Sequence, residues 1–321
     1  MTKVLIVRFS SIGDIVLTSP IIRALKLDAG IEVHFVLKSK YAPVLINNPY
    51  VDKLYTFENE ITEILSELKQ EHYDHIIDLH KNLRSMRLKQ TLGVNSQSFN
   101  KINIEKWLKV NLKINALPEV HIVERYFDTI KFLDVKYDGK GLDYFVNDED
   151  RKAVKLLPEN FKNAYNVFVV GAAHFTKQIT EEQLIKLANL SPLPVVLIGA
   201  KEDMAKAKSI AMAAGNKVFD TCGKLSLNQS AAIVESAEKV ITPDTGFMHI
   251  AAAFSKNIIS FWGNTIPEFG MYPLLQQEAE GTSKIMEVKN LNCRPCSKIG
   301  FEKCPKKHFK CMRDIDLENI F

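Results

Sequence analysis

The two best-known phosphate-binding loops are absent from this chain. It contains no GxGxxG pattern, which dinucleotide-binding units use, and no GxxxxGK(S/T) loop, which holds nucleoside triphosphates. Binding of NAD and hydrolysis of ATP therefore lack their main support. No apolar run approaches the roughly 20 residues that a membrane-spanning helix needs. Residues 1–9 enter a strand pattern without the apolar stretch of a secretion signal. We expect a cytoplasmic protein whose membrane contact is peripheral.

A large excess of charge of one sign is also missing. The formal net charge is +4 and the pI about 8.6, which is mildly basic. This balance falls well short of a nucleic-acid-binding tail, so we expect no nucleic-acid partner, but it suits an anionic substrate or membrane surface. Of the five cysteines, four lie between 293 and 311. In a cytoplasmic protein this pattern indicates free thiols or metal ligands, not disulfides.

The length of 321 residues predicts about two domains at the usual roughly 100 to 200 residues each. Short apolar runs alternate with helical patterns in both halves, which predicts doubly wound α/β units with parallel sheets. The expected strands are Lys3–Phe9, Val33–Leu37, Leu54–Phe57, Ile76–Leu79, Val167–Val170, Pro194–Ile198, Lys217–Phe219, Val240–Thr242 and Ile258–Trp262. The expected helices are Pro20–Lys26, Tyr41–Ile46, Ile61–Leu68, Glu181–Leu190 and Asn228–Ala237. The pattern breaks between 138 and 163, so we expect domains 1–155 and 156–321. A short closing helix, Asp314–Phe321, could pack back on the first domain.

Two similar turns, one in each half, are the candidate ligand sites. Arg8–Asp14 and Pro243–His249 each follow an apolar strand and open a helical run. Gly13 and Gly246 let backbone N–H groups approach an anion, and the positive end of the following helix dipole points at it. Ligands of open parallel sheets bind beyond the carboxyl ends of the strands. The two turns therefore predict a two-domain protein that binds a nucleotide sugar.

Five segments, in order along the chain, carry a family resemblance. Val4–Pro20 resembles the N-terminal signature of the family 9 glycosyltransferases, the ADP-heptose:lipopolysaccharide heptosyltransferases, and Asp244–Ala253 is similar to their second signature. Tyr73–His80, Asn82–Ser85 and His121–Tyr126 fit between the two. The matches span nearly the whole chain.

The resemblance implies a GT-B fold, which is two Rossmann-like domains facing a central cleft. It also implies an inverting, metal-independent transfer of heptose from ADP-heptose to the inner core of lipopolysaccharide, on lipid A carrying Kdo or heptosyl-Kdo. The C-terminal domain would hold the donor and the N-terminal domain the acceptor, at the inner face of the inner membrane. Two alternatives are a GT-B transferase with another donor or a protein acceptor, and a non-catalytic sugar-nucleotide-binding protein.

Two residues match catalytic positions of that family. Inversion by direct displacement needs a carboxylate that takes the acceptor proton and positive groups that hold the leaving diphosphate. Asp14 matches the catalytic base; its alternative role is an N-cap for a helix from Ile15. Lys177 matches the diphosphate-binding lysine; its alternative is a solvated surface charge. The sequence departs from the family's usual Lys-Arg-Trp at Gln178–Ile179.

The two turns supply the other candidate substrate-binding residues: Ser10, Ser11 and Gly13 in the first, and Asp244, Thr245, Gly246 and His249 in the second. We expect Thr245 and Gly246 to donate hydrogen bonds to the diphosphate. Asp244 would orient the turn or a ribose hydroxyl. His249 lies one helical turn beyond Thr245, and contact with ligand and structural support are equally good interpretations.

Charged residues between the signatures are candidates for the acceptor side. Lys81, Arg84 and Arg125 could bind its phosphate or carboxylate groups, or each could be an exposed charge. Lys101–Lys113 mixes four lysines with apolar residues and Trp107. Such a segment can rest on an anionic bilayer, or it can be a surface helix with one apolar stripe on the core.

The last candidates are four cysteines and one loop. Cys293, Cys296, Cys304 and Cys311 include one CxxC pair and could hold a structural zinc ion; reduced buried thiols are the alternative. The run Phe261–Thr265 departs from the family's common Phe-Gly-Pro-Thr form. Because it follows a strand on the donor side, this departure bears on the choice of donor sugar.

Overall fold

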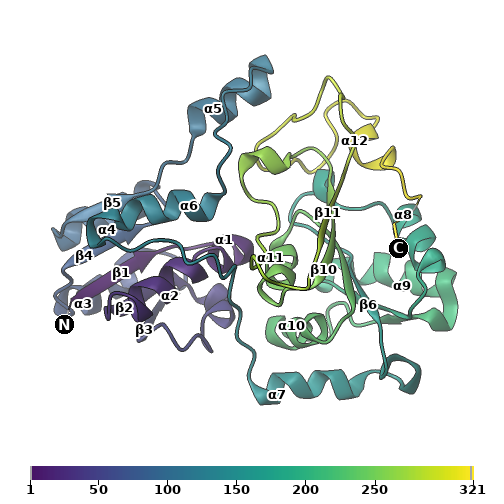
Figure 1. The fold of residues 1–321 in the computed structure, drawn as a ribbon, viewed down its shortest axis with the longest axis horizontal. Coiled ribbons are helices and arrows are strands. Elements are labelled where there is room, and N and C mark those ends of the chain that lie inside the picture. Colours follow the sequence, from purple (N-terminus) through teal and green to yellow (C-terminus); the bar gives the residue numbers. More distant parts are fainter. Residues whose placement is uncertain (1, 319) are drawn as a thin grey trace. The chain divides into compact units, whose positions relative to one another are not determined.

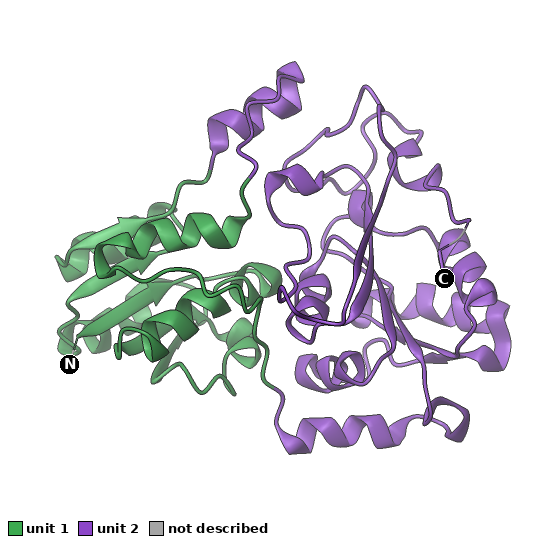
Figure 2. Ribbon diagram, viewed as in Figure 1, with its two compact units in different colours: residues 1–101, 120–145 green, residues 102–119, 146–321 purple. Residues whose placement is uncertain are grey.

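The computed structural model describes residues 2–318, 320 and 321, and the chain divides into two compact units (Figures 1 and 2). Unit 1 consists of Met1–Lys101 and Val120–Phe145, and unit 2 of Ile102–Glu119 and Val146–Phe321. The segment 102–119 therefore belongs to unit 2, although unit 1 flanks it on both sides in the sequence. Figure 2 draws it in the colour of unit 2.

Unit 1 is built on a parallel sheet in the order β3-β2-β1-β4-β5. Its strands are β1 (Lys3–Val7), β2 (Glu32–Lys38), β3 (Lys53–Phe57), β4 (His75–Asp78) and β5 (Ser96–Ser98). Its helices are α1 (Ile12–Val16), α2 (Ser19–Leu27), α3 (Leu65–Gln70), α4 (Leu83–Leu92) and α6 (Ile122–Phe127). Helix α2 packs beside α6, and α3 packs beside α4.

Unit 2 has a second parallel sheet in the order β11-β10-β9-β6-β7-β8. Its strands are β6 (Asn166–Val169), β7 (Val195–Ile198), β8 (Val218–Asp220), β9 (Lys239–Pro243), β10 (Asn257–Trp262) and β11 (Ser283–Glu287). Its helices are α5 (Asn103–Trp107), α7 (Asp148–Arg151), α8 (Glu181–Leu190), α9 (Met204–Ala214), α10 (Leu227–Glu235), α11 (Gly246–Ala253) and α12 (Lys310–Arg313).

Both sheets have the doubly wound strand order. The first strands add to one side of the starting strand, and the later strands then add to its other side. The direction reverses between β1 and β4 in unit 1 and between β6 and β9 in unit 2. Ligands of such sheets bind beyond the carboxyl ends of the strands at this reversal. The turns after β1 and β9, which carry the two signature motifs, lie at these two positions.

The central strands were predictable because both of their faces are covered. Val4–Val7 of β1 and all of β6 and β7 are buried, and strands buried on both faces are continuous apolar runs. The outer strands β5 and β11 were not predicted. Both are polar and mostly exposed edge strands, which lack an apolar pattern.

The chain changes from unit 1 to unit 2 between Phe145 and Val146, ahead of the expected division between 155 and 156. The reason is that residues 148–156 pack against α10 of unit 2. Arg151 also forms an ion pair with Glu235, with 2.9 Å from Nε to Oε2.

Two expected helices are different in the structure. Tyr41–Ile46 overlaps a 3₁₀ turn, Ser39–Val44, whose Pro43 has no N–H for an α-helical bond. Asp314–Phe321 is not a helix in its described residues, which exclude 319. Ile315, Leu317 and Ile320 instead bury their side chains in the core of unit 2. Packing of the chain end on the first domain stays a prediction.

Candidate functional site

The turn after β1 ties Asp14 to its own helix. Helix α1 begins at Ile12 with Ser11 as its N-cap, so Asp14 is the third helical residue and not the cap of a helix from Ile15. Ser11 donates to Asp14 Oδ2 from its backbone N at 3.1 Å and from its Oγ at 2.9 Å. Asp14 therefore supports this turn as well as being the candidate base.

Arg8 is the second member of this site, and the sequence analysis did not single it out. Its Nη2 lies 2.5 Å from Asp14 Oδ1, and its Nε donates to Ser10 O at 2.8 Å. Its Nη1 donates to Leu79 O, directly after β4. Arg8 thus joins the turns that follow β1 and β4, the two strands at the reversal point. The available signal was a charged residue at the end of a buried apolar strand.

The environment of Asp14 strongly favours its ionised form. Burial opposes ionisation, but the Arg8 guanidinium and the hydrogen bonds from Ser11 outweigh it and lower the pKa of Asp14 to about 2. The carboxylate is therefore charged at every physiological pH. In this state it is a weak base, because its proton affinity is held down by Arg8.

Two groups near this ion pair, the partly buried His80 and the buried Tyr126, remain neutral at pH 7. Burial and the charges of Arg8 and Lys101 lower the pKa of His80 to about 4. Burial raises the pKa of Tyr126 to about 12, and its hydroxyl has no hydrogen-bond partner among the described residues. His80 packs on Phe9, with ring centroids 4.8 Å apart. Neither residue was among the predicted site residues.

The acceptor-side candidates lie in three different surroundings. Lys81 is exposed in the turn after β4, where its backbone N donates to Asp78 Oδ1 at 2.7 Å. The Arg84 side chain is half-exposed, and its Nη2 lies 3.2 Å from Glu60 Oε1. Arg125 is 4% exposed and is not a surface charge. Binding of acceptor by these residues stays a prediction.

In unit 2, one carboxylate oxygen of Asp244 contacts residues from two other loops at the reversal point. Lys177 Nζ lies 2.7 Å from Asp244 Oδ2, and Thr265 Oγ1 donates to the same oxygen at 2.8 Å. Lys177 follows β6, Asp244 follows β9 and Thr265 follows β10. The predicted pair of Lys177 and Asp244 is therefore in direct contact at the reversal point. Thr265 is an addition that the sequence analysis did not make.

The lysine loop is held by two neighbouring segments. Thr176 N donates to Phe301 O at 3.1 Å, and Phe301 N donates to Thr176 Oγ1 at 2.8 Å. On its other side, Asn264 N donates to Thr176 O at 3.3 Å. The position of Lys177 thus depends on the loop after β10 and on the cysteine-containing segment.

Arg294, between the two cysteines of the CxxC pair, fixes the loop after β10. Its Nε donates to Gly263 O at 2.7 Å and its Nη2 to Thr265 O at 2.9 Å. The same guanidinium lies 2.7 Å from Glu287 Oε2. A buried arginine with this many carbonyl partners sets loop geometry through its rigid planar fork. It was missed because its carbonyl partners come from a distant part of the sequence.

The turn after β9 presents its helix end as predicted. Thr245 is the N-cap of α11 and makes no side-chain capping bond, so its hydroxyl is not used within the helix. Gly246 opens the helix, where backbone N–H groups and the helix dipole favour an anion. His249 is 2% exposed, within the first turn. Its burial suits the structural interpretation of the two that the sequence left open.

The cysteines lie in one region without converging tightly. Cys293 Sγ is 3.8 Å from His308 Nε2, and burial raises the pKa of Cys311 to about 12. Within the described residues, the potential metal ligands that gather within 4.8 Å of one another are Glu32, His34 and Glu71 of unit 1. Lys3 and Lys53 contact Glu71 at 2.7 and 2.6 Å, so that carboxylate is already neutralised.

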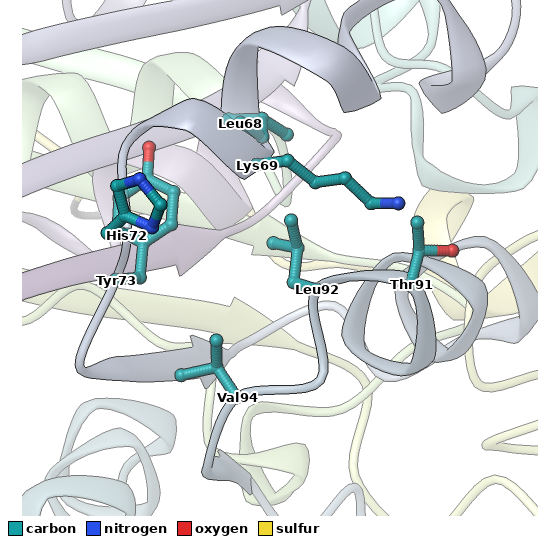
Figure 3. A pocket seen from close by; sticks show the side chains of 7 residues that line it. All are labelled: Leu68, Lys69, His72, Tyr73, Thr91, Leu92 and Val94. Atoms are coloured by element: carbon teal, nitrogen blue, oxygen red, sulfur yellow. The ribbon is translucent and has the colours of Figure 1, made fainter.

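A hollow of about 390 Å³ in unit 1 lies away from these turns (Figure 3). Its lining residues are Leu68, Lys69, His72, Tyr73, Thr91, Leu92 and Val94. Tyr73 and Val94 precede β4 and β5. The hollow is therefore at the amino edge of the sheet, opposite the reversal-point loops, and it is not part of the candidate site.

Comparisons with known proteins show the family of this chain. Residues 61–301 match the family model described as glycosyltransferase family 9 (heptosyltransferase). Lipopolysaccharide heptosyltransferase 1 of Campylobacter coli is 26% identical over 288 residues, which cover 82% of this chain and 84% of that protein.

Two solved structures share the fold. The family 9 glycosyl transferase of Veillonella parvula DSM 2008 has a TM-score of 0.74 at 19% identity, covering 92% of this chain and 90% of that one. The ADP-heptose lipopolysaccharide heptosyltransferase II of E. coli has a TM-score of 0.70 at 18% identity, covering 96% and 97%. The predicted GT-B fold class is confirmed.

Proposed function

This chain belongs to glycosyltransferase family 9, and on that premise we propose that it transfers a heptose from ADP-heptose to the inner core of lipopolysaccharide. The acceptor would be lipid A carrying Kdo or heptosyl-Kdo. The observation that carries the proposal is the contact between Lys177 and Asp244. It places a cation beside an anion-binding helix end at the reversal point of unit 2.

Unit 2 would hold the leaving diphosphate. Lys177 has three N–H donors, of which the contact with Asp244 needs one, so the ammonium can also bind phosphate oxygens. Gly246 and the N–H groups that follow it would share the diphosphate charge. Both described contacts of Asp244 use Oδ2, which leaves Oδ1 to accept from a ribose hydroxyl. These groups would stabilise the charge that develops on ADP as it departs.

Unit 1 would supply the proton acceptor. In the proposed inverting step, the acceptor oxygen bonds to the anomeric carbon, the bond from that carbon to the phosphate oxygen breaks, and the hydroxyl proton passes to Asp14. Because Arg8 makes Asp14 a weak base, the proton would move late, when the C–O bond to ADP is already largely broken.

Ligand binding provides the first test. We expect ADP to raise the unfolding temperature more than UDP, GDP or NAD does, because a ligand that binds only the folded state stabilises it. Transfer from ADP-heptose to a Kdo-containing acceptor, with inverted anomeric configuration by NMR, would complete the test. A preference for UDP or GDP would mean that the donor carries that nucleotide and not ADP. Binding without transfer would favour the non-catalytic alternative.

We also propose a structural zinc ion on Cys293, Cys296, Cys304 and Cys311. The donor set suits zinc, because four thiolates, two of them spaced CxxC, match the ligands of a tetrahedral structural site. Because no three of these thiols lie within 4.8 Å of one another, the ion would draw them together. Elemental analysis of the purified protein tests this. Four freely reactive thiols without zinc release would contradict it.

The third proposal is peripheral contact with an anionic inner membrane from the cytoplasmic side. None of the helices among the described residues is long and apolar enough to span a bilayer. Within 102–119, Ile104 is 74% exposed and Trp107 55%, and no residue of α5 is buried. The alternative, an apolar stripe packed on the core, is therefore wrong for this helix. Neighbouring lysines complement anionic headgroups.

Vesicle binding tests the membrane proposal. We expect the protein to sediment with phosphatidylglycerol vesicles and less with phosphatidylcholine vesicles. Trp107→Ser should weaken this binding. Leu156→Ser is the matched control, because Leu156 is 64% exposed and lies outside the segment. Equal loss in both variants would remove the assignment to 102–119.

A further inference from the structure

A buried amide without a hydrogen-bond partner lies in the loop after β10. Asn264 is 1% exposed, and neither its Nδ2 nor its Oδ1 has a partner among the described residues. Two other buried asparagines use at least one of their amide atoms: Asn166 Nδ2 donates to Ser191 Oγ at 2.9 Å, although its Oδ1 has no partner among the described residues, and Asn48 Oδ1 accepts from Tyr50 N at 2.9 Å. A buried unpaired amide destabilises the free protein. Its presence points to a partner that arrives on binding.

The loop around Asn264 is held firmly in place. Arg294 binds the carbonyl oxygens of Gly263 and Thr265 on either side of it. The backbone N of Asn264 itself donates to Thr176 O at 3.3 Å. The unpaired amide is therefore not the result of a loose loop, since three neighbouring backbone groups are fixed.

The same contacts place Asn264 beside the groups assigned to the donor. Thr265, the next residue, binds Asp244 Oδ2, which also contacts Lys177. Strand β10 pairs with β9 in parallel, so the loop after β10 and the turn at Asp244 lie at the same sheet edge. A ligand whose diphosphate reaches Lys177 thus has its neighbouring groups near Asn264.

The chemistry of the amide selects the ligand group. Nδ2 donates and Oδ1 accepts, so both atoms need complementary partners. A phosphate only accepts hydrogen bonds and would leave Oδ1 unpaired, whereas a hydroxyl pair can accept from Nδ2 and donate to Oδ1. We propose that Asn264 binds a pair of hydroxyl groups on the sugar-nucleotide donor. This inference rests on the proposed function and adds Asn264 as a residue that recognises hydroxyl groups of the donor.

Two parts of the donor carry such hydroxyl pairs, the ribose and the transferred sugar, and they flank the diphosphate. A titration of wild type and Asn264→Ala with ADP and with ADP-heptose separates them. If Asn264 binds the transferred sugar, only ADP-heptose binds more weakly; if it binds the ribose, both ligands do. We expect a loss of roughly tenfold or more, the scale of a buried hydrogen-bonded pair.

A second readout distinguishes ligand contact from a structural role. Without ligand, Asn264→Ala should unfold at the same or a higher temperature than wild type, because it removes an unpaired buried amide. Asn166→Ala is the matched control. Its amide is buried at the amino end of β6 and bonded to Ser191, so it should lower stability and leave ligand affinity unchanged.

Unchanged affinity of Asn264→Ala for both ligands would overturn the inference. If that variant does not fold, wild type titrated with deoxy analogues of the donor decides, and equal binding of every analogue overturns it. Failure of the proposed function has a separate signature, which is that wild type itself does not prefer ADP. In that case the affinities of wild type and Asn264→Ala are compared for the sugar nucleotide that wild type does bind.

Discussion

Arg8 Nη2 lies 2.5 Å from Asp14 Oδ1, and this contact sets the acidity of the proposed base. Because the folded-state pKa of Asp14 is lowered to about 2, its pairing adds stability that is fully present above pH 4 and is lost as the pH falls towards 2. The contribution is on the order of 2 kcal/mol. If Asp14 is the base, the acid limb of kcat/KM should therefore lie near pH 2.

Removing the Arg8 guanidinium should move the acid limb of kcat/KM to a higher pH. In Arg8→Met, burial still opposes ionisation of Asp14 and the attraction of Arg8 is gone, so the pKa of Asp14 should rise. We expect kcat/KM to fall on the acid side at a higher pH than in wild type. Arg8→Lys, which keeps a positive charge, should show a smaller shift. Identical acid limbs in all three proteins would mean that Asp14 does not control the rate.

Asp14→Asn separates the two roles of Asp14. The amide Oδ1 can still accept from Ser11, but an amide cannot take the acceptor proton. We expect transfer to fall about 100-fold or more, as for loss of a general base, and the unfolding temperature to fall as well, because the ion pair with Arg8 is lost. Asp14→Ala should lose the same activity and be less stable than Asp14→Asn by about 1 kcal/mol, because it also loses the hydrogen bonds from Ser11. An Asn variant with full activity would leave Asp14 as a capping residue only.

Lys177→Ala should weaken ADP binding by roughly tenfold to a hundredfold. Part of this loss comes from Asp244, whose Oδ2 would face the diphosphate without its cation. Adding Asp244→Asn removes that negative charge, so the double variant should bind ADP better than Lys177→Ala alone. Calorimetric titration measures both. Equal affinity of wild type and Lys177→Ala would end the diphosphate assignment.

Gly263→Ala should disturb the donor loops without touching a charged group. A Cβ at this position would lie 2.5 Å from Thr176 O and 3.1 Å from Met312 Cε. Since Thr176 O is a backbone atom, the two loops must move apart, at a cost of about 1 to 3 kcal/mol. We expect lower stability and weaker ADP binding in protein that is verified as folded. Unchanged ADP affinity would show that Lys177 does not depend on this contact.

The buried parts of this fold were the most predictable from the sequence. Helix α8 has the predicted bounds, Glu181–Leu190, because its apolar spacing and the Thr180 cap agree. The helix at the chain end was predicted wrongly, since Ile315 and Leu317 are buried without forming a helix, and apolar spacing over so few residues does not distinguish that arrangement from a helix.

The site was predictable as separate motifs and not as a network. Lys177 and Asp244 came from the family resemblance, and their contact could not be inferred from spacing. Arg8, Thr265 and Arg294 were missed because each has a partner that is distant in the sequence, which for Arg8 is Leu79. Their partners are backbone carbonyls or a carboxylate. A carbonyl oxygen is present in every residue and gives no sequence signal.

The assignment of 102–119 to unit 2 also limits how this protein can be divided. The polypeptide passes from one unit to the other at 101/102, at 119/120 and again at 145/146. A single cut near residue 145 would give an N-terminal fragment carrying 18 residues, 102–119, that belong to the other body. A chimera that exchanges unit 2 with that of a relative must therefore join the two sequences at all of these junctions. A single junction would combine unit 2 of the relative with residues 102–119 of this chain, although that segment belongs to the same unit.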